Sequence, residues 1–206
     1  KILTLFFIVF IPILLSQFIH KLNTQSKKEI EIAILQPNID PYYNKYKKSN
    51  EELFELIKNQ SKDYISQNTR YLILPEGYFD SGLGIDLNFI NNSKLKSRID
   101  KFLNQYKNLN IVVGAQSYKI YPESKNPPTN TSNRISDGRW VDIYNSAFQF
   151  SNGNESQFYH KSKLVVGVEF MPYKKLLEPI IGELLLDFGG TIATRGIQNY
   201  RTNFNS

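Results

Sequence analysis

The segment Tyr71-Leu-Ile-Leu-Pro-Glu-Gly77 decides the fold of this chain. Residues 71–74 form a short apolar run that Pro75 ends, and this pattern is typical of a buried strand. The strand delivers a carboxylate, Glu76, at its end. The sequence on either side determines what kind of sheet this strand belongs to.

Amphipathic helices are predicted before and after this strand. Ser49 and Glu52 have the spacing of a capping box, and the helix they begin is expected to run to about Gln67. The apolar residues of each helix fall on one face. These are Leu53, Leu56, Ile57 and Tyr64 in the first helix, and Leu95, Ile99, Phe102, Leu103 and Tyr106 in the second.

Two further strands complete an alternating order. Residues 29–36 alternate and then finish as an apolar run before Pro37, which predicts a buried strand, and residues 111–116 predict another. The order β-α-β-α-β predicts the α/β class, with helices packed on a sheet.

The later part of the chain predicts a hairpin. Residues 121–137 are rich in Pro, Ser and Thr and are expected to form an exposed excursion. Strands are predicted at 141–150 and 157–159, and the Asn-Gly pair at 152–153 suits the turn between them. A helix is expected at 176–186.

The N-terminal segment is apolar enough for a membrane. Residues 2–19 contain no charged side chain and, at about 1.5 Å per residue, would span roughly 27 Å as a helix. We expect a partial transmembrane helix over 1–20, a linker over 21–28 and one domain over 29–206. A signal peptide is the alternative, but only Lys1 precedes the segment and no small-x-small cleavage site lies near Ser16. A buried core helix is less consistent with a segment that has no polar face.

Composition excludes several classes of protein. With 206 residues, 41% hydrophobic and 21% charged, the chain is globular rather than disordered. It has no cysteine, which excludes a disulfide, a thiolate metal site and a cysteine nucleophile within these residues. The net charge of +6 is compatible with an anionic membrane surface. The basic residues form no dense cluster with aromatics, so no nucleic-acid partner is expected, and no metal or organic cofactor is implied.

Two segments carry candidate site residues. Glu76 follows a buried strand, where it could be a general base with its pKa raised by apolar surroundings, or only a helix cap or surface residue. Lys161 and Lys163 precede an apolar run, and Glu169 follows. A lysine at a strand end could stabilise an oxyanion, although lysines also occur as solvated residues on exposed strand edges.

Together, these segments resemble the carbon-nitrogen hydrolase (nitrilase) superfamily, and within it the apolipoprotein N-acyltransferase family. The resemblance covers about residues 29–173 and includes the membrane helix ahead of the domain. The segments that carry it are Ile32-Ala-Ile-Leu-Gln-Pro-Asn-Ile-Asp40, Leu72-Ile-Leu-Pro-Glu76, Asn110-Ile-Val-Val-Gly-Ala115, Tyr144-Asn-Ser-Ala147 and Tyr159-His-Lys161 with Glu169 and Pro172.

The resemblance implies a fold and a set of residue roles. The fold would be an α-β-β-α sandwich, incomplete here, with a Glu-Lys-Cys triad. Glu76 matches the general base, Lys161 the lysine beside the developing oxyanion, and Glu169 a further essential glutamate. Tyr46 is a loose match to an aromatic substrate-binding residue, and Lys163 has no match and is expected to be a surface residue. Aromatic and aliphatic pairs such as 78–79 and 170–171 would either face the membrane or pack in the core.

The resemblance also implies an activity. The protein would move a fatty acyl chain from a phospholipid to the N-terminal diacylglyceryl-cysteine of apolipoproteins, at the bacterial inner membrane with its catalytic domain on the periplasmic side. The alternatives are an anchored or secreted amidase or nitrilase, which uses water as acceptor, and a non-catalytic binding domain on a decayed catalytic fold.

The absent cysteine departs from the family pattern. In the family, the nucleophilic cysteine follows the triad lysine by a few tens of residues, whereas here none follows Lys161. Either the sequence is a fragment that stops before the cysteine, which we expect, or the nucleophile has been lost. In both cases these residues alone would be inactive. We further expect Lys161 within a few ångströms of Glu76, with Lys163 pointing elsewhere.

Overall fold

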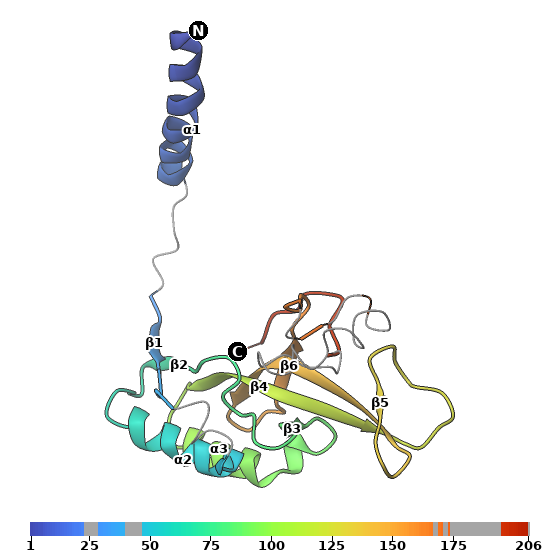
Figure 1. Ribbon diagram of the computed structural model, residues 1–206. Helices are drawn as coiled ribbons and strands as arrows, with labels where there is room; N and C mark the ends of the chain where they lie inside the picture. Colours follow the sequence, from blue (N-terminus) through green and yellow to red (C-terminus); the bar gives the residue numbers. More distant parts are fainter. Residues whose placement is uncertain (23–28, 40–46, 167–168, 171–172, 174–194, 206) are drawn as a thin grey trace. The chain divides into compact units, whose positions relative to one another are not determined.

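The computed structural model describes residues 1–22, 29–39, 47–166, 169–170, 173 and 195–205 (Figure 1). The chain divides into two units, Lys1–Ile30 and Glu31–Ser206. Tyr46, the expected linker residues 23–28 and the expected helix at 176–186 lie outside the described residues. The predictions made for them stay predictions.

The first unit contains one apolar helix, α1 (Ile2–Leu22), with Pro12 inside it. Its segment Leu3–Leu22 has a mean hydropathy of 2.2 in its most apolar window. The predicted helix is therefore confirmed, and it extends two residues into the expected linker. By length and composition it fits either a membrane anchor or a signal sequence.

The second unit is built on one seven-stranded sheet. The order along the sheet is β1-β2-β4-β6-β5, with β3 beside β4 and β7 beside β6. Strands β1, β2 and β4 are parallel, and β6 returns antiparallel to β4 over its full length. The strand bounds are β1 Glu31–Ile34, β2 Thr69–Ile73, β3 Ile85–Asp86, β4 Asn110–Tyr121, β5 Asn133–Arg134, β6 Trp140–Ser151 and β7 Gln157–His160.

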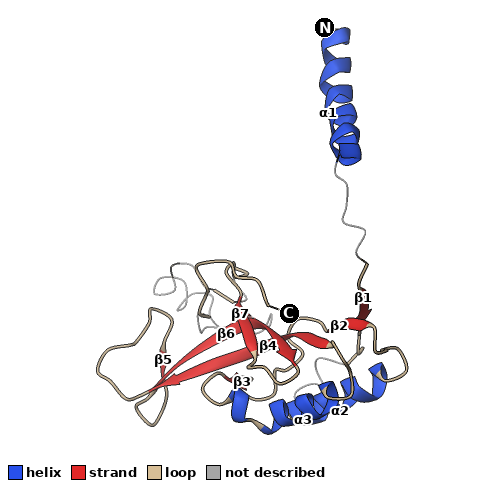
Figure 2. Ribbon diagram, turned by 180° about the vertical axis from the view of Figure 1, so that it is seen from behind, coloured by secondary structure: helices blue, strands red, loops and turns tan. Residues whose placement is uncertain are grey.

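Helices α2 (Asn50–Ser61) and α3 (Lys94–Leu103) cover one face of this sheet, as both ribbon views show (Figures 1 and 2). A short 3-10 helix, η2 (Ile90–Asn92), precedes α3. The predicted capping box is present, because Ser49 and Glu52 exchange hydrogen bonds at the start of α2. The core between helices and sheet includes Leu53, Phe54, Ile57, Ile99, Phe102, Leu103, Leu72, Ile111, Val113, Phe148 and Phe150.

The α/β class and the order of strands and helices are confirmed. The hairpin from β6 to β7 also forms, with Gly153 at φ +70 in its turn. The exposed excursion at 121–137 is present too, although it contains the short strand β5, which the sequence did not predict. Strand β3 was missed as well, since a two-residue strand has no periodicity to detect.

Two local predictions were wrong. Helix α2 ends at Ser61 rather than near Gln67, and Tyr64 is 80% exposed instead of facing the core. Strand β1 is not buried, and its residue Ile34 is 78% exposed. The reason is its position, because β1 lies at the edge of the sheet and, among the described residues, pairs with β2 alone. Apolar sequence alone does not show whether another element covers a strand.

Candidate active site

Glu76 is positioned by a close approach between the end of β2 and the middle of β4. The amide of Gly114 donates to the carbonyl of Pro75 (3.1 Å), and the amide of Tyr78 donates to the carbonyl of Gly114 (2.7 Å). A Cβ atom at Gly114 would overlap the Cα of Glu76 and lie 2.9 Å from the oxygen of Pro75. Glycine is therefore required here for the backbone that carries Glu76 to rest on the sheet.

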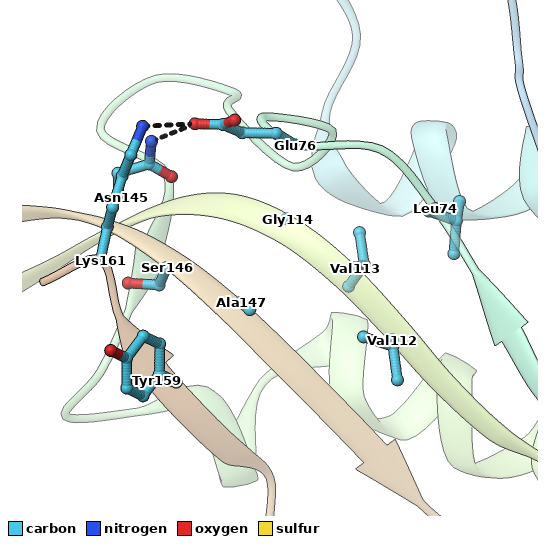
Figure 3. A pocket seen from close by; sticks show the side chains of 10 residues that line it. All are labelled: Leu74, Glu76, Val112, Val113, Gly114, Asn145, Ser146, Ala147, Tyr159 and Lys161. Carbon is cyan, nitrogen blue, oxygen red and sulfur yellow. Dashed lines mark hydrogen bonds and ion pairs between the residues drawn. The ribbon is translucent and has the colours of Figure 1, made fainter. Parts of the chain in front are cut away.

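Lys161 reaches the same place from the end of β7. Its backbone amide donates to the carbonyl of Asn145 (2.8 Å), which continues the pairing of β7 with β6. Its Nζ lies 3.1 Å from Oε1 of Glu76 (Figure 3). It also lies 3.1 Å from Oε2 of Glu169. The predicted proximity of Lys161 to Glu76, across 85 residues of sequence, is confirmed. Lys163 is exposed and, within the described part of the chain, makes none of these contacts.

Asn145 is a site residue that the sequence reasoning did not single out. Its Nδ2 donates to Oε1 of Glu76, as Figure 3 shows. The same Nδ2 donates to Oε1 of Glu169 (2.6 Å), so one amide joins both carboxylates. The available signal was its place in the segment Tyr144-Asn-Ser-Ala147, although β6 contains other polar residues such as Asp142 and Gln149. That signal does not indicate which face of the strand carries a site.

The charges of the cluster stabilise one another. Hydrogen bonds from Asn145 and Lys161 lower the pKa of Glu76, which corrects the expectation of a raised value. Burial alone would raise the pKa of Glu169, but donors from Asn145, the amide of Val165 and Lys161 lower it overall. Burial alone would lower the pKa of Lys161, but the hydrogen bonds that its ammonium donates to Glu169 and Glu76 raise it overall. At neutral pH the cluster therefore holds two carboxylates and one ammonium.

A cavity of about 350 Å³ opens beside the cluster, within the size range of small-molecule sites. Its polar side chains gather at one end and apolar strand residues line the rest (Figure 3). The lining residues are Leu74, Glu76, Val112, Val113, Gly114, Asn145, Ser146, Ala147, Tyr159 and Lys161. Glu76 also lines a second cavity of about 260 Å³ with residues 36–39 and 77–78. The carboxylate is thus reachable from two cavities.

A hydrogen-bond network of three side chains connects the strands on the face of the sheet opposite the site. Oγ of Ser117 lies 2.6 Å from Oγ of Ser146, which lies 2.7 Å from Nδ1 of His160, so the network joins β4, β6 and β7. Neighbours in a strand point to opposite faces, so Ser146 and His160 lie opposite Asn145 and Lys161. Burial lowers the pKa of His160 to about 4, and the imidazole is neutral at physiological pH. This hydrogen-bond network supports β6 and β7, the two strands that position Asn145 and Lys161.

The remaining sequence predictions concern the exposure of two apolar pairs and the binding of a metal. Tyr78 and Phe79 are buried, so they pack in the core and do not face a membrane, while Phe170 is partly exposed. Among the described residues, no group of three or more His, Asp or Glu side chains is arranged to hold a metal ion. The arrangement that the structure provides is a base, a fixed positive charge and a cavity, which suits acyl chemistry.

No family model matches the chain, and no curated protein matches it. Inference about function rests on the geometry of Glu76, Asn145, Lys161 and Glu169.

Proposed function

We propose that this chain carries the base and the oxyanion-stabilising lysine of an N-acyltransferase of the Glu-Lys-Cys type. Its reaction would move a fatty acyl chain from a phospholipid to the N-terminal amine of a diacylglyceryl-cysteine. The observation that carries the proposal is the position of Lys161 Nζ, 3.1 Å from Glu76 at the polar end of a cavity. Acyl transfer needs a base and a fixed positive charge to converge on one acyl carbon.

The residue roles follow from their charges. Glu76, ionised at neutral pH, would take the proton of a cysteine thiol from outside these 206 residues. The thiolate would then attack the ester carbonyl, forming a carbon–sulfur bond as the carbon–oxygen bond breaks and the departing alcohol oxygen takes the proton back. The ammonium of Lys161 would stabilise the oxyanion, while Asn145 and Glu169 would hold Lys161 and Glu76 in place. Attack by the acceptor amine on the thioester would form the amide, and the released thiolate would take up the amine proton through Glu76.

The open face of the sheet supports the finer fold proposal. Ile32 and Ile34 of β1 are exposed, and Val112 and Ala147 near the centre are only half-buried. A second sheet packed on this face would complete the α-β-β-α sandwich and would place its own strand ends above Lys161. A cysteine on such a strand would meet the site, and Tyr46 would remain the proposed aromatic contact to substrate.

The apolar helix α1 supports a membrane setting. If it anchors the protein, enzyme and lipid substrates share one surface, which raises their effective concentration without further contacts. Location at the bacterial inner membrane, with the domain on the periplasmic side, belongs to this proposal.

One observation favours a second candidate, an amidase or nitrilase that transfers the acyl group to water. The side chain of Glu76 is 66% exposed, so water reaches the base without displacing any described residue. A binding domain without catalysis is the third candidate, and the absent cysteine is the observation in its favour.

The test is an assay of the protein encoded by the complete reading frame, with a phospholipid and a diacylated lipopeptide as substrates. We expect transfer, and a loss of at least about 10²-fold in the variants Glu76→Gln and Lys161→Met. The matched controls Glu123→Gln and Lys101→Met change exposed residues, one in the segment after β4 and one in α3, and should leave the rate unchanged. Hydrolysis of small amides without transfer would replace the proposal with the second candidate. A reading frame without a cysteine would favour the third.

A further inference from the structure

Exposed apolar side chains gather in the segment that follows Lys161. The exposed fractions are 49% for Val165, 66% for Val166, 38% for Phe170 and 81% for Tyr173. These four residues are called the apolar projection below. Single exposed apolar residues are ordinary on a protein surface, but four within nine positions beside a candidate site are not.

The projection is held in place by the site itself. The amide of Val165 donates to Oε2 of Glu169 (2.9 Å), and the amides of Glu169 and Phe170 donate back to the carbonyl of Val165 (2.9 and 3.3 Å). Glu169 is buried and its carboxylate contacts Lys161. The polar side chain of the turn is therefore turned inward, while the neighbouring apolar side chains are presented to solvent. Because the turn is already ordered, burying the projection against a partner would cost little additional conformational entropy.

We infer that the apolar projection inserts into the surface of a lipid bilayer. Three observations favour a bilayer over a protein partner. The same chain contains the apolar helix α1, whose segment Leu3–Leu22 is long enough to cross a membrane. Lys163 is exposed at the base of the projection, where an ammonium would meet anionic headgroups. The most exposed member is Tyr173, a residue type enriched where water and bilayer meet.

Insertion would bring the headgroup region of the bilayer next to Lys161. The inference goes beyond acyl transfer, because it rests on exposure and hydrogen bonding and holds for any chemistry at the cluster. Under the proposed function, it would additionally explain how an ester held in the membrane reaches a site built on a sheet.

The absence of cysteine makes a direct test possible, because a single introduced cysteine can be labelled selectively. The full 206-residue chain is reconstituted into nanodiscs of phosphatidylcholine with an admixture of phosphatidylglycerol, and a polarity-sensitive dye is attached at one position at a time. Two pairs are matched in exposure. Val166→Cys (66%) is compared with Phe89→Cys (65%), and Tyr173→Cys (81%) with Tyr64→Cys (80%).

We expect blue-shifted emission at Val166 and Tyr173, with quenching by lipids brominated near the headgroup rather than at the chain ends, because interfacial insertion reaches about 5–10 Å. The dyes at Phe89 and Tyr64 should emit as they do in water. Charge reversal by Lys163→Glu should weaken the shift at Val166 in the phosphatidylglycerol-containing nanodiscs and leave it unchanged in pure phosphatidylcholine.

Water-like emission at Val166 and Tyr173 would overturn the inference and favour a protein partner for the projection. Equal insertion at all four labelled positions would also overturn it, because the bilayer would then bind exposed side chains anywhere on the domain and not the projection in particular. Circular dichroism of each labelled chain confirms that it has folded. Neither result depends on turnover, so this test and the acyl-transfer assay can fail separately.

Discussion

The two faces of the sheet differ in what covers them and in what they carry. On the face that α2 and α3 cover, strand side chains such as Phe148 and Phe150 are fully buried. On the other face, Val112 and Ala147 are half-buried, and Asn145 contributes to the charged cluster. Because successive side chains of a strand alternate between faces, the same strands build both. The site is thus supported by the core without being part of it.

The largest expected effect lies on the covered face. Phe148→Ala should lower the free energy of unfolding by about 3–5 kcal/mol, because it leaves a cavity among fully buried side chains. Phe158→Ala is the matched control, since Phe158 pairs with Phe148 in the sheet but is 40% exposed, and its loss should be clearly smaller. Urea denaturation of both variants measures the difference. Equal losses of unfolding free energy in the two variants would mean that burial of Phe148 does not make it more important for stability than the exposed Phe158.

A sharper comparison uses two neighbouring valines of β4. The side chain of Val113 is fully buried, whereas that of Val112 is half-buried on the open face, although both residues line the cavity. Val113→Ala should cost about 1.5–3 kcal/mol and Val112→Ala less than about 1 kcal/mol in unfolding free energy. The same denaturation experiment compares them. If Val112→Ala in the complete protein proved as costly as Val113→Ala, the open face would be packed there, as the proposed sandwich requires.

Gly114 affects both the stability of the sheet and the position of Glu76, because the backbone of Glu76 packs directly against this strand residue. Gly114→Ala should cost about 1–3 kcal/mol of unfolding free energy through overpacking, and should move Glu76 away from Lys161. Lysine-selective NMR would then show the pKa of Lys161 falling towards its ordinary value. Gly82→Ala is the control, since a Cβ there meets nothing within 4 Å although φ is +60. It should cost stability through backbone strain alone and leave the pKa of Lys161 unchanged.

Much of the fold could be predicted because its signals are local. The capping box at Ser49 and the periodicity of α2 and α3 depend on residues a few positions apart, and they were confirmed. Burial of β1 and of Tyr64 was predicted wrongly, because burial depends on which elements lie next to a residue in space. The short strands β3 and β5 exist only through their pairing with β4 and β6.

The candidate site shows the same division. The proximity of Glu76 and Lys161 was expected from a resemblance across several segments and not from spacing alone, and the structure confirms it. The raised pKa expected for Glu76 was wrong, because the register of β6 brings the amide of Asn145 to its carboxylate. Register across 69 residues of sequence is a tertiary property that no local pattern contains.

The smallest expected effect is the loss of stability in Glu76→Gln, and it should depend on pH, unlike losses caused by substitutions on the covered face. The pKa of Glu76 is lower in the folded chain than that of a free glutamate. Its ionised form therefore contributes stability that is fully present above that free value and is lost as pH falls through the lowered folded pKa. Since the side chain is 66% exposed and screened by solvent, Glu76→Gln should cost only about 0.2–1 kcal/mol at pH 7.

At acid pH, where Glu76 in the unmodified chain is itself protonated, the difference between the two chains should vanish. Urea midpoints of both chains, followed from neutral pH down to the pH at which their difference stops changing, test this, since groups that do not contact the cluster contribute equally to each chain and cancel in the difference. Phe148→Ala provides the contrast from the covered face, because the loss of buried apolar contacts has no proton to exchange and should stay constant with pH. A Glu76→Gln difference that grew towards acid pH would contradict the lowered pKa, and with it the assignment of Asn145 and Lys161 as the groups that keep Glu76 ionised.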